Sequence, residues 1–487
     1  MRLCVCLILL LLPAFSSAAP VFCVAADGHD DTGDGSSGNP WATITHAVDS
    51  VPDGALVLVR PGLYGGRVSL RRQFAQGITV RSEVPCQAQL RHTATVVQCF
   101  YGQGITLEGF DIAHSGPGAG ALVVQIQDLL DQPGAGERVE RITLRGNVIH
   151  DSWNNDLLKI NNGARDILVE GNVFHNQAGS DEHIDINSVT DVVVQDNIFF
   201  NDFAGSGRTD GSDTSSFIVI KDSNGDSDAI TGAERITVRR NVFLHWQGSA
   251  GSNFILCGED GQDFFEARDV LIENNLMLGD SASVMRAAFG VKGCRDITFR
   301  HNTVSGDLPS LAYAMRLNRE GANRPSENIR FLNNIWCDPA GTMGAENPAR
   351  PNDFSDTPPA DTLSWTLRRN LAWNGPAPIP FDAAELINFS ADPEGIALSP
   401  SLPTPAALTL PRWDPQTGLF GDGSATIRQA FVRLVNDWGT PGPGSVAIGA
   451  ADPSESPAGD ILGLPRDQAP DLGAVEVPGG ALGLILD

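Results

Sequence analysis

The chain has 487 residues, of which 59 are acidic and 33 are basic, and its formal net charge at pH 7 is −26. This charge argues against nucleic acid as a partner, because the phosphate backbone would be repelled. A polyanionic sugar could bind such a chain only through a local basic groove or a bridging cation.

Residues 1–18 have the pattern of a secretory signal peptide. Arg2 precedes a long apolar run, and small residues follow at positions 16–19, as signal cleavage requires. No later apolar run reaches the length of a membrane span. We therefore expect a protein that is secreted, periplasmic or on the cell surface, with no membrane span.

Cysteine usage supports an exported protein. An even number of cysteines remains after the signal peptide, and in an oxidising compartment this predicts disulfides whose pairing stays open. No C-x-x-C pair is present, which argues against a zinc site built from cysteines. The remaining residues are Cys23, Cys86, Cys99, Cys257, Cys294 and Cys337.

Residues 21–70 are predicted to form an N-terminal cap. Turn signals rich in Asp and Gly precede an amphipathic segment, Thr43–Val51, which is expected to be helical. A buried strand over 55–64 follows and contains the Pro61–Gly62 turn. Such a helix would cover the open end of a stack of strands, where bare edges invite aggregation.

An internal repeat dominates residues 140–375. Each copy is an alternating apolar run, a polar bend with an asparagine, and a second apolar pair, as in Ile142–Ile149. The shortest spacings are 25 and 27 residues, too short for the roughly 40 to 45 residues of a propeller blade. We expect asparagine to adopt the left-handed backbone at the bend and to hydrogen-bond its equivalent one coil away. The repeated asparagines are Asn147, Asn172, Asn197, Asn241, Asn275, Asn302, Asn334 and Asn370.

These features predict an all-β fold, a right-handed parallel β-helix over residues 19–375. Residues 339–478 contain 21 of the 31 prolines, so the repeat is expected to end there. Residues 376–487 are predicted to be a Pro-rich segment packed on the solenoid. It contains one amphipathic helix, Ser424–Trp438, with Ser424 as N-cap.

Both ends of the chain resemble secreted proteins of the pectate-lyase-like parallel β-helix superfamily. The opening, Asp34–Tyr64, is similar to their D-G-x-G … P-W/F-x-T-I-x-x-A … V-x-P-G-x-Y pattern, and Asp471–Glu476 resembles their D-x-G-A-x-E ending. With the repeat, the resemblance covers most of the first 375 residues. It implies the fold and leaves the function open.

Polar side chains from three successive coils are expected to meet on one outer face of the solenoid. In the segment 181–187, Ile184 and Ile186 should point inward, so that His183, Asp185 and Asn187 point outward. Lys159 then projects beside Asp185. Strands of successive coils are about 4.8 Å apart, which brings distant parts of the sequence together.

This face could perform elimination chemistry. Four carboxylates offer an oxygen-rich site for Ca²⁺, namely Asp156, Asp181, Glu182 and Asp185. A bound cation would hold the carboxylate of a uronic acid sugar and stabilise the charge that develops when the proton at sugar carbon 5 leaves. Lys221 would take that proton, with a pKa lowered by the cation and by partial burial.

The arrangement is similar to that of family 9 pectate lyases, in which an Asp precedes D-D-x-x-D by about 25 residues and a lysine follows on the next coil. The resemblance implies that Asp156, Asp181, Glu182 and Asp185 are calcium ligands and that Lys221 is the Brønsted base. This chain departs from the pattern at Glu182, which replaces an Asp, and at Lys221, which lies in Ile-Val-Ile-Lys-Asp rather than between glycines.

Further cations on this face are expected to bind substrate. Arg286, Arg316 and Arg319 could grip sugar carboxylates with their planar guanidinium groups. Lys159 and His183 are assigned to substrate binding as well. Three other histidines follow the repeated asparagines and are predicted to lie in turns without a chemical role: His150, His175 and His245.

The leading hypothesis is a secreted, calcium-dependent polysaccharide lyase that cleaves a uronic-acid polymer as a monomer. A glycoside hydrolase on the same scaffold is one alternative, because it needs two carboxyl groups at a defined separation. A non-catalytic, carbohydrate-binding or adhesive β-helix is the other, because repeat folds often serve as extended surfaces.

Overall fold

The computed structural model describes residues 19–129, 138–179, 181–208, 215–225, 230–248, 252–345, 353–405 and 408–478. The predicted signal peptide, residues 1–18, lies outside the described residues. Within these ranges, no helix is both long and apolar enough to cross a membrane.

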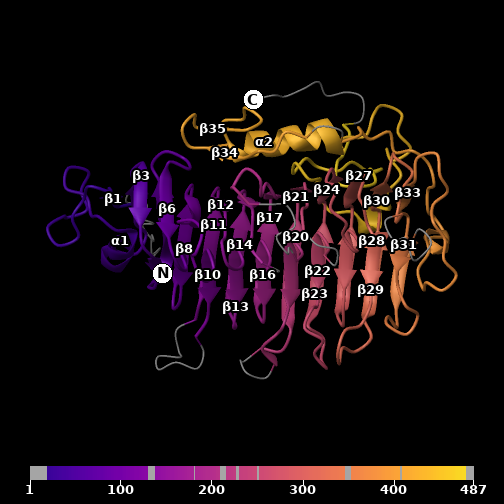
Figure 1. Cartoon of the computed structure of the whole chain (residues 1–487), viewed down its shortest axis with the longest axis horizontal. Helices are drawn as coiled ribbons and strands as arrows, with labels where there is room; N and C mark the ends of the chain where they lie inside the picture. Colours follow the sequence, from indigo (N-terminus) through magenta and orange to yellow (C-terminus); the bar gives the residue numbers. More distant parts are fainter. Residues whose placement is uncertain are drawn as a thin grey trace, which may run out of the picture.

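Three long parallel sheets wind around a common axis, and successive coils stack along the length of the molecule (Figure 1). The predicted right-handed parallel β-helix is therefore confirmed. The twelve-stranded sheet contains β1 (Val21–Val24), β2 (Leu56–Val59), β5 (Gln73–Ser82), β8 (Gln103–Glu108), β11 (Glu140–Arg145), β14 (Arg165–Glu170), β17 (Thr190–Gln195), β20 (Ala233–Arg239), β23 (Ala267–Glu273), β26 (Arg295–Arg300), β29 (Glu327–Leu332) and β32 (Trp365–Arg368).

The other two sheets complete each coil. The ten-stranded sheet contains β4 (Val68–Leu70), β7 (Val97–Cys99), β10 (Val124–Gln127), β13 (Leu158–Asn161), β16 (Ile184–Asn187), β19 (Ile218–Lys221), β22 (Ile255–Cys257), β25 (Phe289–Val291), β28 (Ala312–Leu317) and β31 (Asp353–Asp356). The eleven-stranded sheet contains β3 (Gly62–Gly65), β6 (Ala88–His92), β9 (Asp111–His114), β12 (Val148–His150), β15 (Val173–His175), β18 (Ile198–Phe200), β21 (Val242–Leu244), β24 (Leu276–Gly279), β27 (Thr303–Gly306), β30 (Ile335–Cys337) and β33 (Leu371–Trp373).

The asparagine ladder forms as predicted and runs along the bends between the twelve-stranded and eleven-stranded sheets. Asn147 Nδ2 donates to Asn172 Oδ1 over 3.0 Å, and Asn172 Nδ2 donates to Asn197 Oδ1 over 3.0 Å. The same contact repeats to Asn370, whose Nδ2 donates to Asp392 Oδ2. The ladder therefore satisfies the buried polar groups of each bend, which would otherwise oppose folding.

One detail of the ladder prediction is wrong. The left-handed backbone belongs to the residue before each asparagine, for example Gly146 at φ 63° and Asp196 at φ 58°. The asparagine itself is turned inward so that its amide can bond along the axis. Backbone conformation and hydrogen bonding are thus divided between two adjacent residues.

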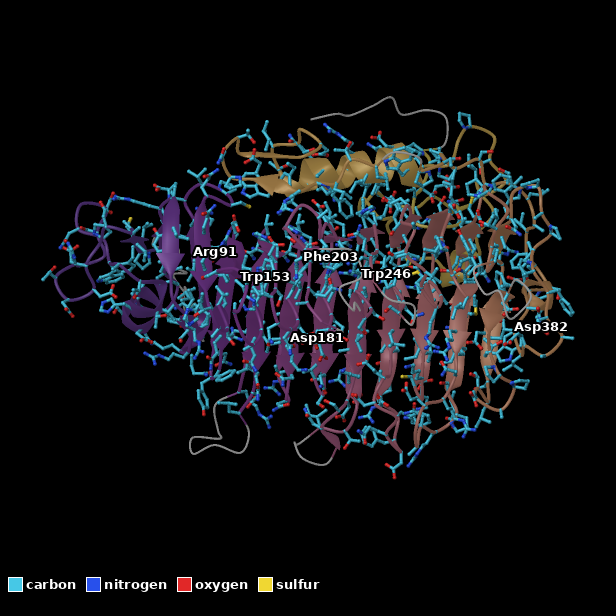
Figure 2. The ribbon with its side chains drawn as sticks, in the orientation of Figure 1. Arg91, Trp153, Asp181, Phe203, Trp246 and Asp382 are labelled. Atoms are coloured by element: carbon cyan, nitrogen blue, oxygen red, sulfur yellow. The ribbon has the colours of Figure 1, made fainter. Side chains whose placement is uncertain are left out.

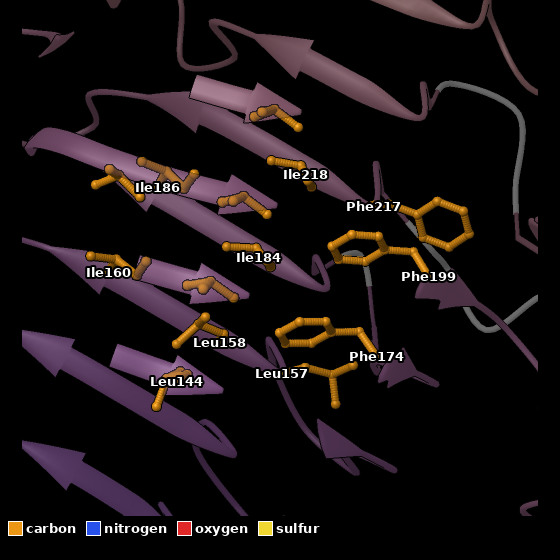
Figure 3. Close-up of a cluster of buried hydrophobic side chains, with 14 of the residues drawn as sticks. Leu144, Leu157, Leu158, Ile160, Phe174, Ile184, Ile186, Phe199, Phe217 and Ile218 are labelled. Atoms are coloured by element: carbon orange, nitrogen blue, oxygen red, sulfur yellow. The ribbon is translucent and has the colours of Figure 1, made fainter. Parts of the chain in front are cut away.

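Apolar side chains of all three sheets fill the solenoid interior. Figure 3 shows Leu158, Ile184 and Ile218 in one row and Phe174 and Phe199 in another. The rings of Phe174 and Phe199 stack at 5.1 Å between centroids. Each inward column repeats an apolar side chain from coil to coil, because parallel pairing places equivalent positions side by side.

Both predicted helices are present. α1 (Ile44–Ser50) is capped by Thr43, whose side chain accepts a hydrogen bond from His46 N. α2 (Ile427–Leu434) is capped by Thr426 rather than by Ser424, and continues as η3 (Val435–Gly439). The described chain also contains η2 (Phe389–Ala391), η4 (Pro453–Glu455) and the antiparallel hairpin of β34 (Trp413–Asp414) and β35 (Leu419–Phe420).

The C-terminal segment lies along the solenoid, with α2 nearly parallel to the long axis (Figure 1). Its apolar face packs on the outer face of the eleven-stranded sheet, where Phe431 and Leu434 belong to one buried cluster with Val173 and Val242. This contact does not involve the ten-stranded sheet. The candidate site lies on that sheet.

The disulfide prediction is wrong for the described residues. All six cysteines are buried and free, and none is paired with another. Cys99 and Cys257 occupy inward positions of β7 and β22, where they pack as small apolar side chains. Burial raises the pKa of each of these two thiols to about 12, which makes them unreactive.

Candidate active site

The outer face of the ten-stranded sheet brings the predicted side chains together. Lys159 on β13 pairs with Asp185 on β16 in the strand register, as the alternation predicted. Asn187, two residues beyond Asp185 on β16, pairs with Lys221 on β19. Two adjacent columns therefore contain both lysines and the central aspartate.

Three carboxyl groups converge beside these columns. Asp156, Glu182 and Asp185 each offer an oxygen, and the three oxygens lie within 4.8 Å of one another. All three residues are buried, with exposed fractions of 1%, 4% and 1%. Asp156 precedes β13 and holds the next coil by accepting a hydrogen bond from Glu182 N at 2.9 Å.

Asp181 lies beside this group but its carboxylate is outside it. Its charge interacts with Lys159 and Asp185, and Figure 2 places it midway along the solenoid. The structure thus assembles three of the four predicted metal ligands, with the fourth at the edge.

Two ammonium groups neutralise part of the acid cluster. Lys159 Nζ is 2.5 Å from Asp185 Oδ2 and 4.0 Å from Asp156 Oδ2. Lys221 Nζ is 3.8 Å from the same Asp185 oxygen and 2.5 Å from Glu259 Oε2. Asp185 is therefore the shared partner of both lysines.

Sequence reasoning missed Glu259 and Asp260, which contact Lys221 from a loop after β22. Asp260 Oδ2 lies 3.8 Å from Lys221 Nζ. The loop is organised by the buried Glu266, whose carboxylate accepts the backbone N–H groups of Glu259 and Asp260 at 2.8 and 2.9 Å. No periodic pattern marks a loop residue of this kind, so the printed sequence contains no clear signal for it.

The acidic groups of the site outnumber its two ammonium groups, and burial raises the pKa values of several of these acids. Burial and then the Asp185 charge raise the pKa of Asp156 to about 7. Burial raises the pKa values of Asp181 and Asp260 to about 6 and that of Glu182 well above its usual range. A nearby cation would lower the pKa values of these acids and so favour their ionised forms.

The protein's own groups act on the Lys221 pKa in opposite directions. Burial acts to lower this pKa, but the charges of Asp185, Glu182 and Glu259 outweigh it and hold the pKa above its ordinary value. Lys221 is therefore charged here. A proton acceptor at this position requires added positive charge nearby.

The donor set fits a divalent cation of the calcium type. Asp185 Oδ1 is buried and has no hydrogen-bond partner among the described residues, which is costly unless another group binds it. The available donors are carboxylate oxygens, which hard cations prefer. Lys159 would have to turn away from Asp185 to admit the ion, and its partly exposed side chain gives it room.

The predicted outward orientation of His183 is wrong. This ring is fully buried and lies tilted against Phe217 at 4.6 Å between centroids, while its Nε2 contacts Asn201 Oδ1 at 3.0 Å. β16 begins at Ile184, so the two-residue alternation does not extend back to position 183. The ring is part of the interior and does not reach the substrate face.

The three predicted arginines are placed differently from one another. Arg316 lies in the same column as Lys159 and Asp185, four strands beyond Asp185 or roughly 19 Å away. Its Nε donates to Asp356 Oδ2 at 2.7 Å. Arg319 instead pairs with Asp361 at an exposed loop.

Arg286 lies before β25 rather than within this strand of the ten-stranded sheet. Its guanidinium makes no ion pair within the described part of the chain, and its pKa is lowered by burial and by the neighbouring Arg316 charge. The charges of Asp356 and Glu320 partly offset these two guanidinium groups, which together still form a positive patch. This patch suits an anionic group of a ligand.

Comparisons with known proteins were made on sequence and on structure. No protein-family model matches the chain, and no curated protein matches it in sequence. The structure is similar to that of pectate lyase Pel9A, with 13% identity, a TM-score of 0.50, and coverage of 94% of this chain and 97% of that one. The chain therefore has a polysaccharide-lyase-like parallel β-helix fold.

Two further solved structures align less closely. A rhamnogalacturonan lyase has 13% identity and a TM-score of 0.48, with 72% of this chain and 87% of that chain covered. XylC in its complex with xylose has 10% identity and a TM-score of 0.47, with coverage of 79% and 87%.

Proposed function

We propose that the protein is a secreted, calcium-dependent polysaccharide lyase that cleaves a uronic-acid polymer by β-elimination. The observation that carries this proposal is the convergence of Asp156, Glu182 and Asp185 beside two lysines at the ten-stranded sheet. The lyase-like fold supports it by analogy only.

The carboxylates of Asp156, Glu182 and Asp185 would hold the cation, with Asp181 completing the set through a small side-chain movement. When bound, Ca²⁺ supplies positive charge that offsets the local acids and stabilises the carboxylate side of the developing enolate. These residues otherwise keep one another in place, since Asp156 fixes the Glu182 backbone.

Lys221 is proposed as the base. Its Nζ would accept the proton from sugar carbon 5, the C5–H electron pair would form the C4=C5 double bond, and the bond from C4 to the leaving oxygen would break. Glu259 and Asp260 position the amine from the far side. Lys159, displaced from Asp185, would face the sugar carboxylate.

The proposed binding track continues toward Arg286 and Arg316. Both guanidinium groups lie toward the C-terminal coils of the same sheet and could hold the carboxylate of a sugar several units from the reacting one. Arg319, paired with Asp361 at the exposed rim, would contribute less.

The test is a panel of uronans, such as pectate and alginate, assayed by the ultraviolet absorbance of the unsaturated product. Activity should require calcium, disappear with a chelator, and return on adding calcium back. Lys221→Ala should lose activity by about 10² to 10⁴-fold, while Lys292→Ala, a lysine paired with Glu320 two coils away, should not.

Other outcomes decide between the alternatives. Release of reducing ends without the ultraviolet signal would identify a glycoside hydrolase. Binding of a uronan without turnover would identify a carbohydrate-binding protein. Full activity in Lys221→Ala would refute the assigned base.

A further inference from the structure

A second group of potential metal ligands lies on the eleven-stranded sheet, away from the site described above. His150, Asp151 and His175 each offer one ligand atom, and these atoms lie within 4.8 Å of one another. Arg91, which lines the cavity over this group, is nearer the N-terminal end of the solenoid than Asp181 (Figure 2). The prediction that His150 and His175 lie in turns is wrong, since they end β12 and β15.

The group borders a cavity of about 430 Å³ between this sheet and the C-terminal hairpin. Both histidines line it, together with Arg91, Arg412 and Trp413. The volume is ample for water molecules, each of which occupies about 30 Å³ in the liquid. The ligand group is therefore shielded from bulk solvent but accessible to small species.

An unpartnered atom points to a missing ligand. His175 is only 1% exposed, and its Nδ1 has no hydrogen-bond partner in the structure. The ring stacks on His150 at 4.8 Å between centroids with an interplanar angle of 21°. A buried ring nitrogen without a partner is uncommon, because its desolvation is not repaid.

The neighbouring residues orient these ligands as the outer shell of a metal site does. His150 Nε2 lies 2.7 Å from Asp111 Oδ1, and Arg91 holds the same oxygen at 2.6 Å. Asn176 Nδ2 donates to Asp151 Oδ1 at 2.8 Å, which leaves Asp151 Oδ2 facing His150 Nδ1 at 2.9 Å. A carboxylate behind a ligating histidine fixes the ring and its tautomer.

We propose that His150 Nδ1, Asp151 Oδ2 and His175 Nδ1 bind a divalent transition-metal ion of the zinc class. Tetrahedral ligands at about 2.0 to 2.2 Å from Zn²⁺ are roughly 3.4 Å apart, and each ring binds through its own plane, so the two imidazoles would rotate out of their stacked arrangement to bind the ion. The fourth position would be taken by water from the cavity.

Two arginines near the group select the kind of ion. Arg208 and Arg412 approach Asp151 at 3.6 and 3.8 Å, but their closer contacts are backbone carbonyls for Arg208 and Asp202 for Arg412. Their charge disfavours a site that holds its ion mainly by electrostatic attraction, such as one for Ca²⁺. Imidazole nitrogen favours Zn²⁺, Ni²⁺ or Cu²⁺.

The experiment is calorimetric titration of metal-free, full-length protein with Zn²⁺ in a calcium-free buffer. Wild-type protein should bind zinc, and His175→Gln and Asp151→Asn should weaken this binding at least 100-fold. Asp111→Asn, which removes only the orienting carboxylate, should weaken it by about 10 to 100-fold. Asp185→Asn should leave it unchanged, which separates this site from the calcium site.

A matched control and a direct measurement complete the test. His245→Gln changes another histidine that follows a strand and contacts a carboxylate, Asp280, and should retain zinc binding. Anomalous scattering at the zinc edge from crystals of wild-type protein should show a peak between His150 and His175. A peak elsewhere only, no peak, or zinc affinity unaltered in His175→Gln would each overturn the proposal, whatever the outcome of the lyase assay.

Discussion

Asp185→Asn is the most direct test of the acid cluster, because one oxygen of Asp185 contacts Lys159 at 2.5 Å and the other has no partner. The amide keeps the size of the side chain and removes its charge. A hydrogen bond to a charged group contributes about 1.5 to 3 kcal/mol. We therefore expect the metal-free variant to lose about that much unfolding free energy.

The same substitution should weaken calcium binding at least tenfold, since about 1.5 kcal/mol of ligand interaction corresponds to that factor. Calorimetry would measure the affinity, and chemical denaturation without calcium would measure stability. Asp191→Asn is the matched control, because Asp191 contacts Arg235 at 2.7 Å on the twelve-stranded sheet. This exposed pair should contribute at most about 1 kcal/mol and leave calcium affinity unchanged. Equal calcium affinity in Asp185→Asn and wild type would refute the assigned ligand.

Three other changes probe the ladder, the binding track and the C-terminal contact. Asn197→Ala should lower the free energy of unfolding by about 3 to 5 kcal/mol, because the buried Asn172 N–H loses its acceptor and three further hydrogen bonds are broken. Chemical denaturation should show a much smaller loss for the exposed Asn328→Ala. Arg286→Ala should raise KM about tenfold with little change in kcat if the arginine binds substrate before and during reaction alike. Burial holds the pKa of His301 well below that of the unfolded chain, so stability should fall as pH drops below about 6.5, by up to about 1.4 kcal/mol per pH unit. Denaturation of His301→Gln across this range should show a smaller slope, and an unchanged slope would contradict the assignment.

The stacking of the coils could be predicted because it depends on repeated local patterns. Apolar alternation on strands such as β13 and β16 fixes which residues point outward, so the pairing of Lys159 with Asp185 followed directly. Asn147 and its equivalents marked each bend. Where the pattern is regular, position in the sequence determines position in space.

Prediction failed where the chain leaves the regular strands. The two-residue alternation of β16 was extended one residue too far, to His183. Arg286 lies before β25, where this alternation does not apply. Glu259 and Asp260 depend on the buried Glu266, a loop contact with no periodic signature. The disulfide prediction failed for another reason: the even number of cysteines suggested pairing, but all six are buried and free, and Cys99, Cys257 and Cys294 are part of the apolar interior.

The longer spacings of the repeat bring further charged groups to the acid cluster, which itself lies in coils of the shortest spacing. Between Asn197 and Asn241 the coil gains residues on both sides of β19, and between Asn241 and Asn275 it gains them on both sides of β22. These additions adjoin the ten-stranded sheet, and one of them brings Glu259 and Asp260 to Lys221. The asparagine ladder continues unbroken through the same coils, so the inserted residues do not disturb the stack. A rigid stack with insertions at the edge of one sheet can concentrate charged residues there without disturbing the fold. A site that binds a cation and an anionic polymer together requires such a concentration of charged residues.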